Sequence, residues 1–197
     1  MTNLKSAAGQ GNGATGNIKT GALRAAFILS LIFATICAAE EWATPVKLEG
    51  APNLHRVTNN IYRSAQPTAD GFKNLQELGV KTVINLRQFH SDDEETSGTK
   101  LKAIRVKMEA WDPETKEVIR VLKILSDPEG APYLVHCQHG ADRTGLAIAA
   151  YRIVVQGWDK EEAITEMTEG GYGFHPIWTD IPKFLRRMDA EAIRKRL

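Results

Sequence analysis

The feature that most constrains this chain is the stretch from Tyr133 to Gly145, which reads YLVHCQHGADRTG. An apolar run of β type ends at Cys137, and a short loop containing Gly140 then leads into an apolar helical segment. This order predicts a buried strand, a loop at its carboxyl end and a helix that begins at the loop. Because a helix N-terminus beside a glycine-containing loop favours a bound anion, the stretch predicts a phosphate-binding site.

The spacing of Cys137 and Arg143 supports this prediction. Five residues separate them, so a loop that closes over one oxyanion would bring a thiolate and a guanidinium to the same phosphate. Gly140 allows such a loop to curl without a Cβ clash. We expect the backbone amides of the loop to face inward and to supply most of the phosphate contacts. These amides belong to Gln138, His139, Gly140, Ala141, Asp142 and Arg143.

The same loop would make its cysteine reactive. Inward amides, the helix N-terminus and Arg143 all favour the negatively charged thiolate form of Cys137. Arg143 offers two parallel N–H donors to two phosphate oxygens, which a lysine cannot do. Thr144 follows at a position from which its hydroxyl could stabilise the departing thiolate. We therefore expect Cys137 to act as a nucleophile and Arg143 to hold the phosphate.

The segment from His136 to Gly145 resembles the signature of the cysteine-dependent protein tyrosine and dual-specificity phosphatases, in its residues and in its strand-loop-helix setting. Residues 61–67 (IYRSAQP) and 83–87 (VINLR) resemble segments of bacterial dual-specificity-type phosphatases. The resemblance covers roughly residues 57–188. It implies a phosphomonoester hydrolase that forms a cysteinyl-phosphate intermediate and uses neither a metal ion nor another cofactor.

The resemblance also implies an acid that protonates the leaving group, carried on a loop before the signature. Asp112 is the preferred residue, because Trp111-Asp112-Pro113 has the composition of the family's Trp-Pro-Asp loop, although in a different order. The alternative for Asp112 is a cap of the following helix. Glu109, Glu114 and Asp142 are the other acids that could donate the proton.

Three histidines lie in or near the predicted site. We expect His136 to set the conformation of the loop and the state of the thiolate through hydrogen bonds. His139 is expected at the rim of the site. His175 is expected on a surface turn, with a loop facing the site as the alternative.

The sequence indicates the substrate less clearly than the type of reaction. A phosphotyrosyl or dual-specificity protein substrate ranks first, and a phosphoinositide or other small phosphoester ranks second. Asp142 before Arg143 resembles the loops of some lipid phosphatases, but the loop lacks the lysine that those enzymes often carry. A phospho-binding module without turnover is a further alternative. The last is a rhodanese-type sulfurtransferase, whose active loop resembles Cys, four residues, Arg, one residue shorter than the loop here.

The N-terminal part of the chain differs in composition from the rest. Residues 1–24 are rich in small and polar residues and contain three basic residues but no acid, so a disordered basic leader is expected. Residues 25–39 form an uncharged apolar run, which is short for a bilayer span of about 20 residues. The run is predicted to be a signal peptide cleaved after Ala39. A membrane anchor and a core helix are the alternatives.

The remaining chain is long enough for one domain. Residues 40–53 are predicted to be a linker, because they contain two prolines and no periodicity, and residues 54–197 are predicted to be the phosphatase domain. Counting the whole chain, 25 basic and 24 acidic residues nearly balance, so nothing indicates a nucleic-acid partner. We expect an exported, extracytoplasmic monomer, with membrane contact through residues 25–39 if the apolar run is an anchor.

Strand and helix patterns alternate through the domain and predict an α/β fold, a central, mostly parallel sheet flanked by helices, as in the small dual-specificity phosphatases. Strands are expected at 54–57, 61–64, 80–86, 104–108 and 133–136. Helices are expected after Thr68, with Pro113 in a first turn, after the reactive loop and after Asp159, with one more at the C-terminus. The acidic run within residues 90–99 is interpreted as a solvated loop, with a metal site as the alternative.

Overall fold

The computed structural model describes residues 41–197. The leader predicted for residues 1–24 and the apolar run of residues 25–39 lie outside the described residues. Within residues 41–197, none of the helices combines the length and the apolar character needed to cross a bilayer.

A sheet of six strands forms the centre of the domain, in the order β1-β2-β3-β6-β4-β5. The strands are β1 (Thr44–Pro45), β2 (His55–Thr58), β3 (Ile61–Ser64), β4 (Thr82–Asn85), β5 (Lys102–Arg105) and β6 (Tyr133–His136). β6 pairs in parallel with β3 and β4, and β4 pairs in parallel with β5, whereas the pairs β1-β2 and β2-β3 are antiparallel. The prediction of a mostly parallel sheet flanked by helices is confirmed.

The central strands are apolar because helices cover both of their faces. Successive residues of a strand point to opposite faces, and the core is divided accordingly. Val83 and Leu134 pack in one hydrophobic cluster with Phe72 of the first helix. Ile84 and Val135 pack in a second, larger cluster with the remaining helices.

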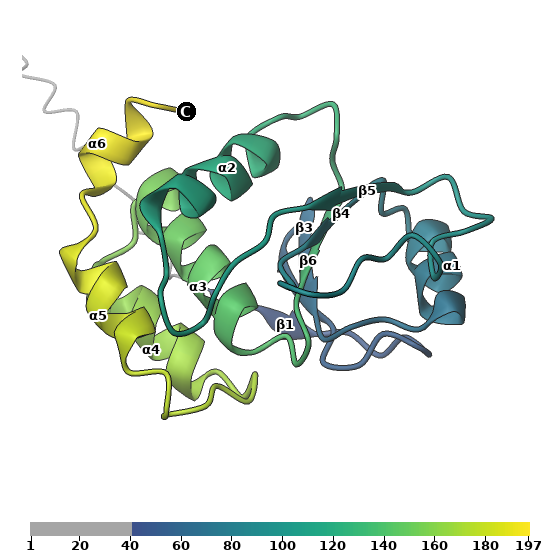
Figure 1. Cartoon of the computed structure of the whole chain (residues 1–197), viewed down its shortest axis with the longest axis horizontal. Helices are drawn as coiled ribbons and strands as arrows, with labels where there is room; N and C mark the ends of the chain where they lie inside the picture. Colours follow the sequence, from purple (N-terminus) through teal and green to yellow (C-terminus); the bar gives the residue numbers. More distant parts are fainter. Residues whose placement is uncertain (1–40) are drawn as a thin grey trace, which may run out of the picture. The chain divides into compact units, whose positions relative to one another are not determined.

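Six α-helices in residues 41–197 accompany the sheet, with α1 on one face and the others on the opposite face (Figure 1). They are α1 (Ala69–Glu77), α2 (Thr115–Leu125), α3 (Asp142–Tyr151), α4 (Lys160–Glu169), α5 (Asp180–Arg187) and α6 (Ala190–Arg194). The predicted start of α1 is confirmed, since the Thr68 hydroxyl accepts a hydrogen bond from the Gly71 amide at 3.1 Å. α2 begins two residues later than the position of Pro113 suggests, with Glu114 as its N-cap.

The helix that follows the reactive loop is buried, as its apolar composition predicts. Eight of the residues of α3 are buried, including Thr144 and Leu146. The helix continues as a π-helical segment, Arg152–Gln156, and ends at Gly157, whose φ of 80° suits a glycine. α3 therefore starts at the reactive loop and runs through the middle of the helical layer (Figure 1).

The prediction that residues 40–53 are a linker is wrong for the part that the structure describes. Thr44 and Pro45 form β1, and the Val46 amide donates to the Leu54 carbonyl at 2.9 Å. Ala43 and Ala51 are buried in the two core clusters. The segment lacks a periodic pattern because its contribution is one short edge strand and a few small buried side chains. The domain therefore begins before Leu54.

Two predicted elements have different bounds. The strand expected at 104–108 ends at Arg105, although Val106 and Met108 continue into the core as irregular backbone. The C-terminal helix is divided into α5 and α6, because Met188 leaves the helical region with ψ 129°. Asp189 then caps α6 by accepting from the Ala192 amide at 2.9 Å.

Candidate active site

The reactive loop lies at the carboxyl end of β6, the strand between β3 and β4. His136, the last residue of β6, is in register with Ser64 of β3 and Asn85 of β4. Cys137 follows directly and is 1% exposed. Because all three strands are parallel, the segments that leave β3 and β4 surround the loop. The sheet thus places Cys137 on the same edge as residues 65–67 and 86–88.

Four backbone carbonyl groups of the loop accept hydrogen bonds from groups outside it. Backbone amides donate to two of them, Gln66 to the Gln138 oxygen at 3.3 Å and Gly145 to the Ala141 oxygen at 2.7 Å. Side chains donate to the other two, Asn53 to the His139 oxygen at 3.0 Å and Arg63 to the Gly140 oxygen at 2.8 Å. Four successive carbonyl oxygens, of Gln138, His139, Gly140 and Ala141, are therefore directed away from the centre of the loop.

This arrangement determines where the amides point. In a planar trans peptide the C=O of one residue and the N–H of the next lie on opposite sides. Outward carbonyls at residues 138–141 consequently turn the N–H groups of residues 139–142 inward. α3 begins at Asp142, so its N-terminus faces the same space. This geometry is suited to an anion, in keeping with the phosphate-binding site expected from the sequence, and the loop is called the cradle below.

Gly140 is required by close packing as well as by backbone conformation. Its φ is +69°, which L side chains rarely adopt. A Cβ on Gly140 would lie 2.5 Å from the Ala65 nitrogen and 2.5 Å from the Ser64 carbonyl atoms. The loop therefore rests directly on the backbone that follows β3.

Arg63 supports the loop through its hydrogen bond to the Gly140 carbonyl. The sequence does not predict it as a site residue. Its side chain is 1% exposed, and its guanidinium lies 3.8 Å from the centre of the Tyr172 ring. Burial lowers the pKa of Arg63 to about 10, opposed by Tyr172 and Glu166 and by Cys137. Arg63 is therefore still a cation at neutral pH, and it lies under the cradle where it favours negative charge.

Arg143 and Thr144 each have a buried polar atom that no described residue binds. These atoms are the Nε of Arg143 and the hydroxyl of Thr144. Buried donors are normally paired, so these two are suited to a bound ligand. Burial first, and repulsion from Arg143 second, lower the pKa of Arg87, while the negative charges of Asp92 and Cys137 oppose this shift.

His136 is fixed by a buried network that the sequence did not indicate. Its Nε2 lies 2.8 Å from the Asp92 carboxylate, and both side chains are buried. Gln66 donates to Asp92 at 2.9 Å and accepts from Arg87 at 2.9 Å. Burial alone would raise the pKa of Asp92, but hydrogen bonds from His136 and Gln66 outweigh burial and hold it below its usual range. For Asp92, the interpretation of the acidic run as solvated is wrong.

Asp142 and the two remaining histidines form a group at the rim. Asp142 is largely buried, and its carboxylate accepts from the His175 amide at 2.9 Å. The Nδ1 of His175 lies 2.9 Å from the other carboxylate oxygen. The rings of His139 and His175 have centroids 5.2 Å apart. His175 therefore faces the site, which was the alternative to a surface turn.

Asp112 lies on the exposed loop between β5 and α2. It is not the cap of α2, since that position is occupied by Glu114. Its neighbour Trp111 has its ring centroid 6.5 Å from that of Trp178, whose amide donates to the His175 carbonyl at 3.0 Å. The loop of Asp112 is thus adjacent to the segment that carries His175, at the rim of the cradle.

The other acids considered as proton donors already have partners. Glu109 accepts from Gln88 at 3.0 Å. Glu114 pairs with Lys116 at 2.5 Å. Asp142 is bound by His175, as described above.

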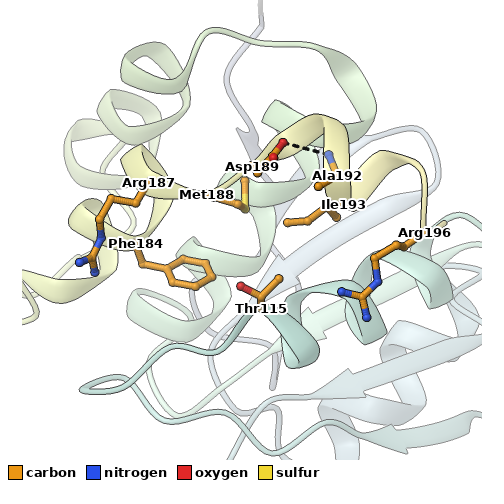
Figure 2. Close-up of a pocket in the computed structure, with 8 residues that line it drawn as sticks. All are labelled: Thr115, Phe184, Arg187, Met188, Asp189, Ala192, Ile193 and Arg196. Atoms are coloured by element: carbon orange, nitrogen blue, oxygen red, sulfur yellow. Dashed lines mark hydrogen bonds between the residues drawn. The ribbon is translucent and has the colours of Figure 1, made fainter.

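A cavity of about 320 Å³ lies elsewhere in the domain, where α5 and α6 meet the start of α2 (Figure 2). It is lined by Thr115, Phe184, Arg187, Met188, Asp189, Ala192, Ile193 and Arg196. None of these residues belongs to the reactive loop or to the segments that support it. The cavity is therefore separate from the candidate active site.

Residues 51–173 match the tyrosine phosphatase family. The chain belongs to the tyrosine phosphatase family. The matched residues include the cradle, its supports Asn53 and Arg63, and His136 with its partner Asp92. Two other segments in the match, 61–67 and 83–87, are those that the sequence associates with bacterial dual-specificity-type enzymes.

Relatives and solved structures within the tyrosine phosphatase family agree with this assignment. The chain is 38% identical over 156 residues to the dual specificity protein phosphatase TpbA of Pseudomonas aeruginosa, covering 78% of this chain and 69% of TpbA. A crystal structure of TpbA superimposes with a TM-score of 0.72 at 35% identity, covering 80% of this chain and 97% of that one. Another TpbA structure holds phosphotyrosine. The predictions of the small phosphatase fold and of phosphatase chemistry are confirmed.

A more distant relative carries a different substrate in its name. The inositol diphosphatase DSP5 of Arabidopsis thaliana is 29% identical over 123 residues, covering 58% of this chain and 60% of DSP5. Relatives of this chain thus differ in the substrates that their names give.

Proposed function

We propose that this protein dephosphorylates phosphotyrosyl or dual-specificity protein substrates through a cysteinyl-phosphate on Cys137, without a metal ion. The observation that carries the proposal is the outward orientation of four successive loop carbonyls, which turns the amides inward around Cys137. The relation to TpbA supports a protein substrate.

In the first step the Cys137 sulfur attacks phosphorus, so that a P–S bond forms while the P–O ester bond breaks. The inward amides and Arg143 hold the phosphoryl oxygens and stabilise the charge that spreads over them. The leaving oxygen takes a proton from Asp112. Phosphate charge is thus balanced by the protein's own groups.

In the second step a water oxygen attacks phosphorus while Asp112 takes its proton, and the P–S bond breaks. The thiolate that departs is stabilised by the amides and by the Thr144 hydroxyl, whose position in the buried first turn of α3 supports this role. His136 keeps the start of the loop in place through Asp92. Enzyme and inorganic phosphate are then regenerated.

The proposal is tested with para-nitrophenyl phosphate in the presence of a chelator. We expect turnover by the purified protein and none by Cys137→Ser. Tight phosphopeptide binding without turnover would instead support a phospho-binding module, and sulfur transfer from thiosulfate would support a sulfurtransferase. Either result would contradict the proposed hydrolase.

Phosphoinositides, inositol diphosphates or other small phosphoesters are the second candidate substrates. In addition to the relation to DSP5, four basic side chains line a groove of about 450 Å³ beside β5. They belong to Arg105, Lys107, Lys116 and Arg120. Arg105 also donates to the Arg87 carbonyl at 3.1 Å, which links this groove to the active-site side of β4. Anions with several phosphates would suit such a groove.

A panel of phosphotyrosyl peptides, phosphothreonyl peptides, phosphoinositides and inositol diphosphates, assayed with one preparation, separates the two candidates. We expect the highest kcat/KM for phosphotyrosyl peptides. A higher kcat/KM for a multiply phosphorylated inositol, lowered by Arg120→Glu, would favour the second candidate instead.

We also propose that the domain is exported, because the basic leader, the apolar run and Ala39 have the order of a signal peptide. The mature N-terminus would then be Glu40. N-terminal sequencing and fractionation of expressing cells test this prediction. Full-length chain in the cytosol would contradict both cleavage and membrane anchoring.

A further inference from the structure

Three potential metal ligands meet at the rim of the cradle: His139, Asp142 and His175. One donor atom from each lies within 4.8 Å of the other two. The Nδ1 of His175 is 2.9 Å and 3.1 Å from the two carboxylate oxygens of Asp142. Two donors that bind one tetrahedral ion at ~2.0–2.1 Å lie about 3.3 Å apart. The spacing of this pair is therefore close to that of two ligands of one ion.

The chemical types of the three ligands favour a particular class of metal. Two imidazoles and one carboxylate suit zinc, cobalt and similar divalent transition ions, whereas magnesium and calcium prefer oxygen ligands only. Three protein ligands also leave a fourth position open for water or for a phosphate oxygen. The side chain of His175 is 47% exposed, so an ion can reach it from solvent.

The backbone around the three ligands is held in place before any ion binds. Asn53 donates to the His139 carbonyl at 3.0 Å and to the Tyr172 carbonyl at 2.9 Å, so one side chain ties together the loops of His139 and His175. Asp142 is fixed as the first residue of α3 and by the His175 amide. Supports of this kind orient metal ligands.

We propose that His139, Asp142 and His175 bind a divalent transition-metal ion of the zinc class, and that this ion reversibly inhibits the enzyme. His139 and Asp142 both belong to the loop between Cys137 and Arg143, so the ion would lie at the mouth of the cradle. There the ion is coordinated by two residues of the loop, and it obstructs the approach of a phosphoester. Catalysis itself does not use the ion, and its binding does not depend on the proposed substrate.

A second group of possible ligands provides a comparison within the same chain. His90, Asp92 and Glu95 also have donor atoms within 4.8 Å of one another. Asp92, however, is engaged by His136 and Gln66, which lie outside this second group, whereas the partner of Asp142 is His175, one of the proposed ligands. We therefore expect the rim group, and not this second group, to bind the ion.

Binding is tested in the Cys137→Ser protein, which removes the thiolate as an alternative ligand. Cobalt is the probe, and its binding is measured by visible absorption and by calorimetry. We expect one equivalent to bind, with an absorption band of tetrahedral coordination. Affinity should fall by roughly tenfold or more in the His175→Ala and His139→Ala versions, since even outer-shell partners change metal affinity by about 10–100-fold. The His90→Ala version should bind as tightly as its parent.

Inhibition is tested in the protein with its cysteine intact, by adding zinc to a phosphatase assay and reversing the effect with a chelator. Both His175→Ala and His139→Ala should require roughly tenfold more zinc for half inhibition. Equal zinc sensitivity in all proteins would assign inhibition to the Cys137 thiolate and overturn the proposal. Absence of cobalt binding in Cys137→Ser, or its loss in His90→Ala alone, would also overturn it.

Discussion

At the scale of single residues, Asp112 is the acid that we propose as the proton donor. It lies on an exposed loop and does not cap α2, whereas Glu109, Glu114 and Asp142 are engaged by other residues. Asp112→Asn should slow hydrolysis of alkyl phosphates, which have poor leaving groups, by roughly 10²–10⁴-fold. Activated aryl phosphates should be affected much less, because their leaving groups need little protonation.

The measurement is kcat for a series of phosphoesters with graded leaving groups, with Glu109→Gln as the control. The variant should also lose the fall in rate on the basic side of the pH profile. Equal losses across the series would show that Asp112 acts structurally, and the same series would then be measured for the other acids.

A second prediction for a single residue concerns Gly140. Gly140→Ala should destabilise the domain and abolish phosphate protection of Cys137 against alkylation, because its Cβ would meet backbone at 2.5 Å. Gly157→Ala is the matched control, since Gly157 also has a positive φ but has nothing within 4 Å of the added carbon. That variant should lose only about 1–2 kcal/mol of stability from backbone strain and retain phosphate protection. Similar behaviour of the two variants would contradict the role given to close packing.

At the scale of elements, the segments after β3 and β4 hold β6 and its loop through Gln66, Asp92 and His136. The pKa of Asp92 is lowered, so its carboxylate contributes stability above its unfolded value of 3.8, and this contribution is lost as pH falls through the lower folded value. Asp92→Asn should cost about 1–3 kcal/mol near pH 7, through weaker hydrogen bonding of buried His136. Its stability should then vary less than that of the parent below pH 4.

Urea unfolding at several pH values measures this difference. Asp93→Asn is the control, because Asp93 is exposed in the same acidic run. Its effect should remain within about 0.5 kcal/mol. An equal effect of the two substitutions would contradict the buried network.

Helices and strands can be predicted from the sequence where a local pattern of residues determines them. The β-branched strands, the Thr68 cap and the apolar α3 follow from short-range rules, and so does the cradle. The supports could not be predicted in this way, because Asn53 binds a residue 86 positions away and Asp92 one 44 positions away. The motif at residues 61–67 contains Arg63 and Gln66, but it does not indicate their roles.

At the scale of the whole molecule, a chain of contacts joins the first described residues to the cradle. The Ala43 amide donates to Glu166 at 2.8 Å, and the Tyr172 hydroxyl lies 3.2 Å from both Glu166 and the Ala43 carbonyl. Glu166 also pairs with buried Arg152. Arg63 connects Tyr172 to the Gly140 carbonyl. The segment before β2 is therefore part of the folded catalytic domain.

Truncation tests this conclusion. A chain that begins at residue 54 should lose at least about 3 kcal/mol relative to one that begins at 41, since the three hydrogen bonds that involve Glu41 and Ala43 alone each contribute about 1 kcal/mol. Thermal unfolding measures the loss. Asn53→Ala in the longer chain removes only the hydrogen bonds from Asn53 to the His139 and Tyr172 carbonyls. This variant should bind phosphate more weakly, with a smaller loss of stability than the truncation. Equal stability of the two truncations would contradict the contribution of residues 41–53.

The central claim is that Cys137 carries the phosphoryl group during turnover. The most direct measurement is rapid quenching with an alkaline denaturant during hydrolysis of para-nitrophenyl phosphate, followed by peptide mass spectrometry. The account predicts one phosphoryl group on the peptide that contains Cys137, formed as quickly as nitrophenol is released and absent in Cys137→Ser. Turnover that continues in Cys137→Ser, or a phosphoryl group found on another residue, would contradict it.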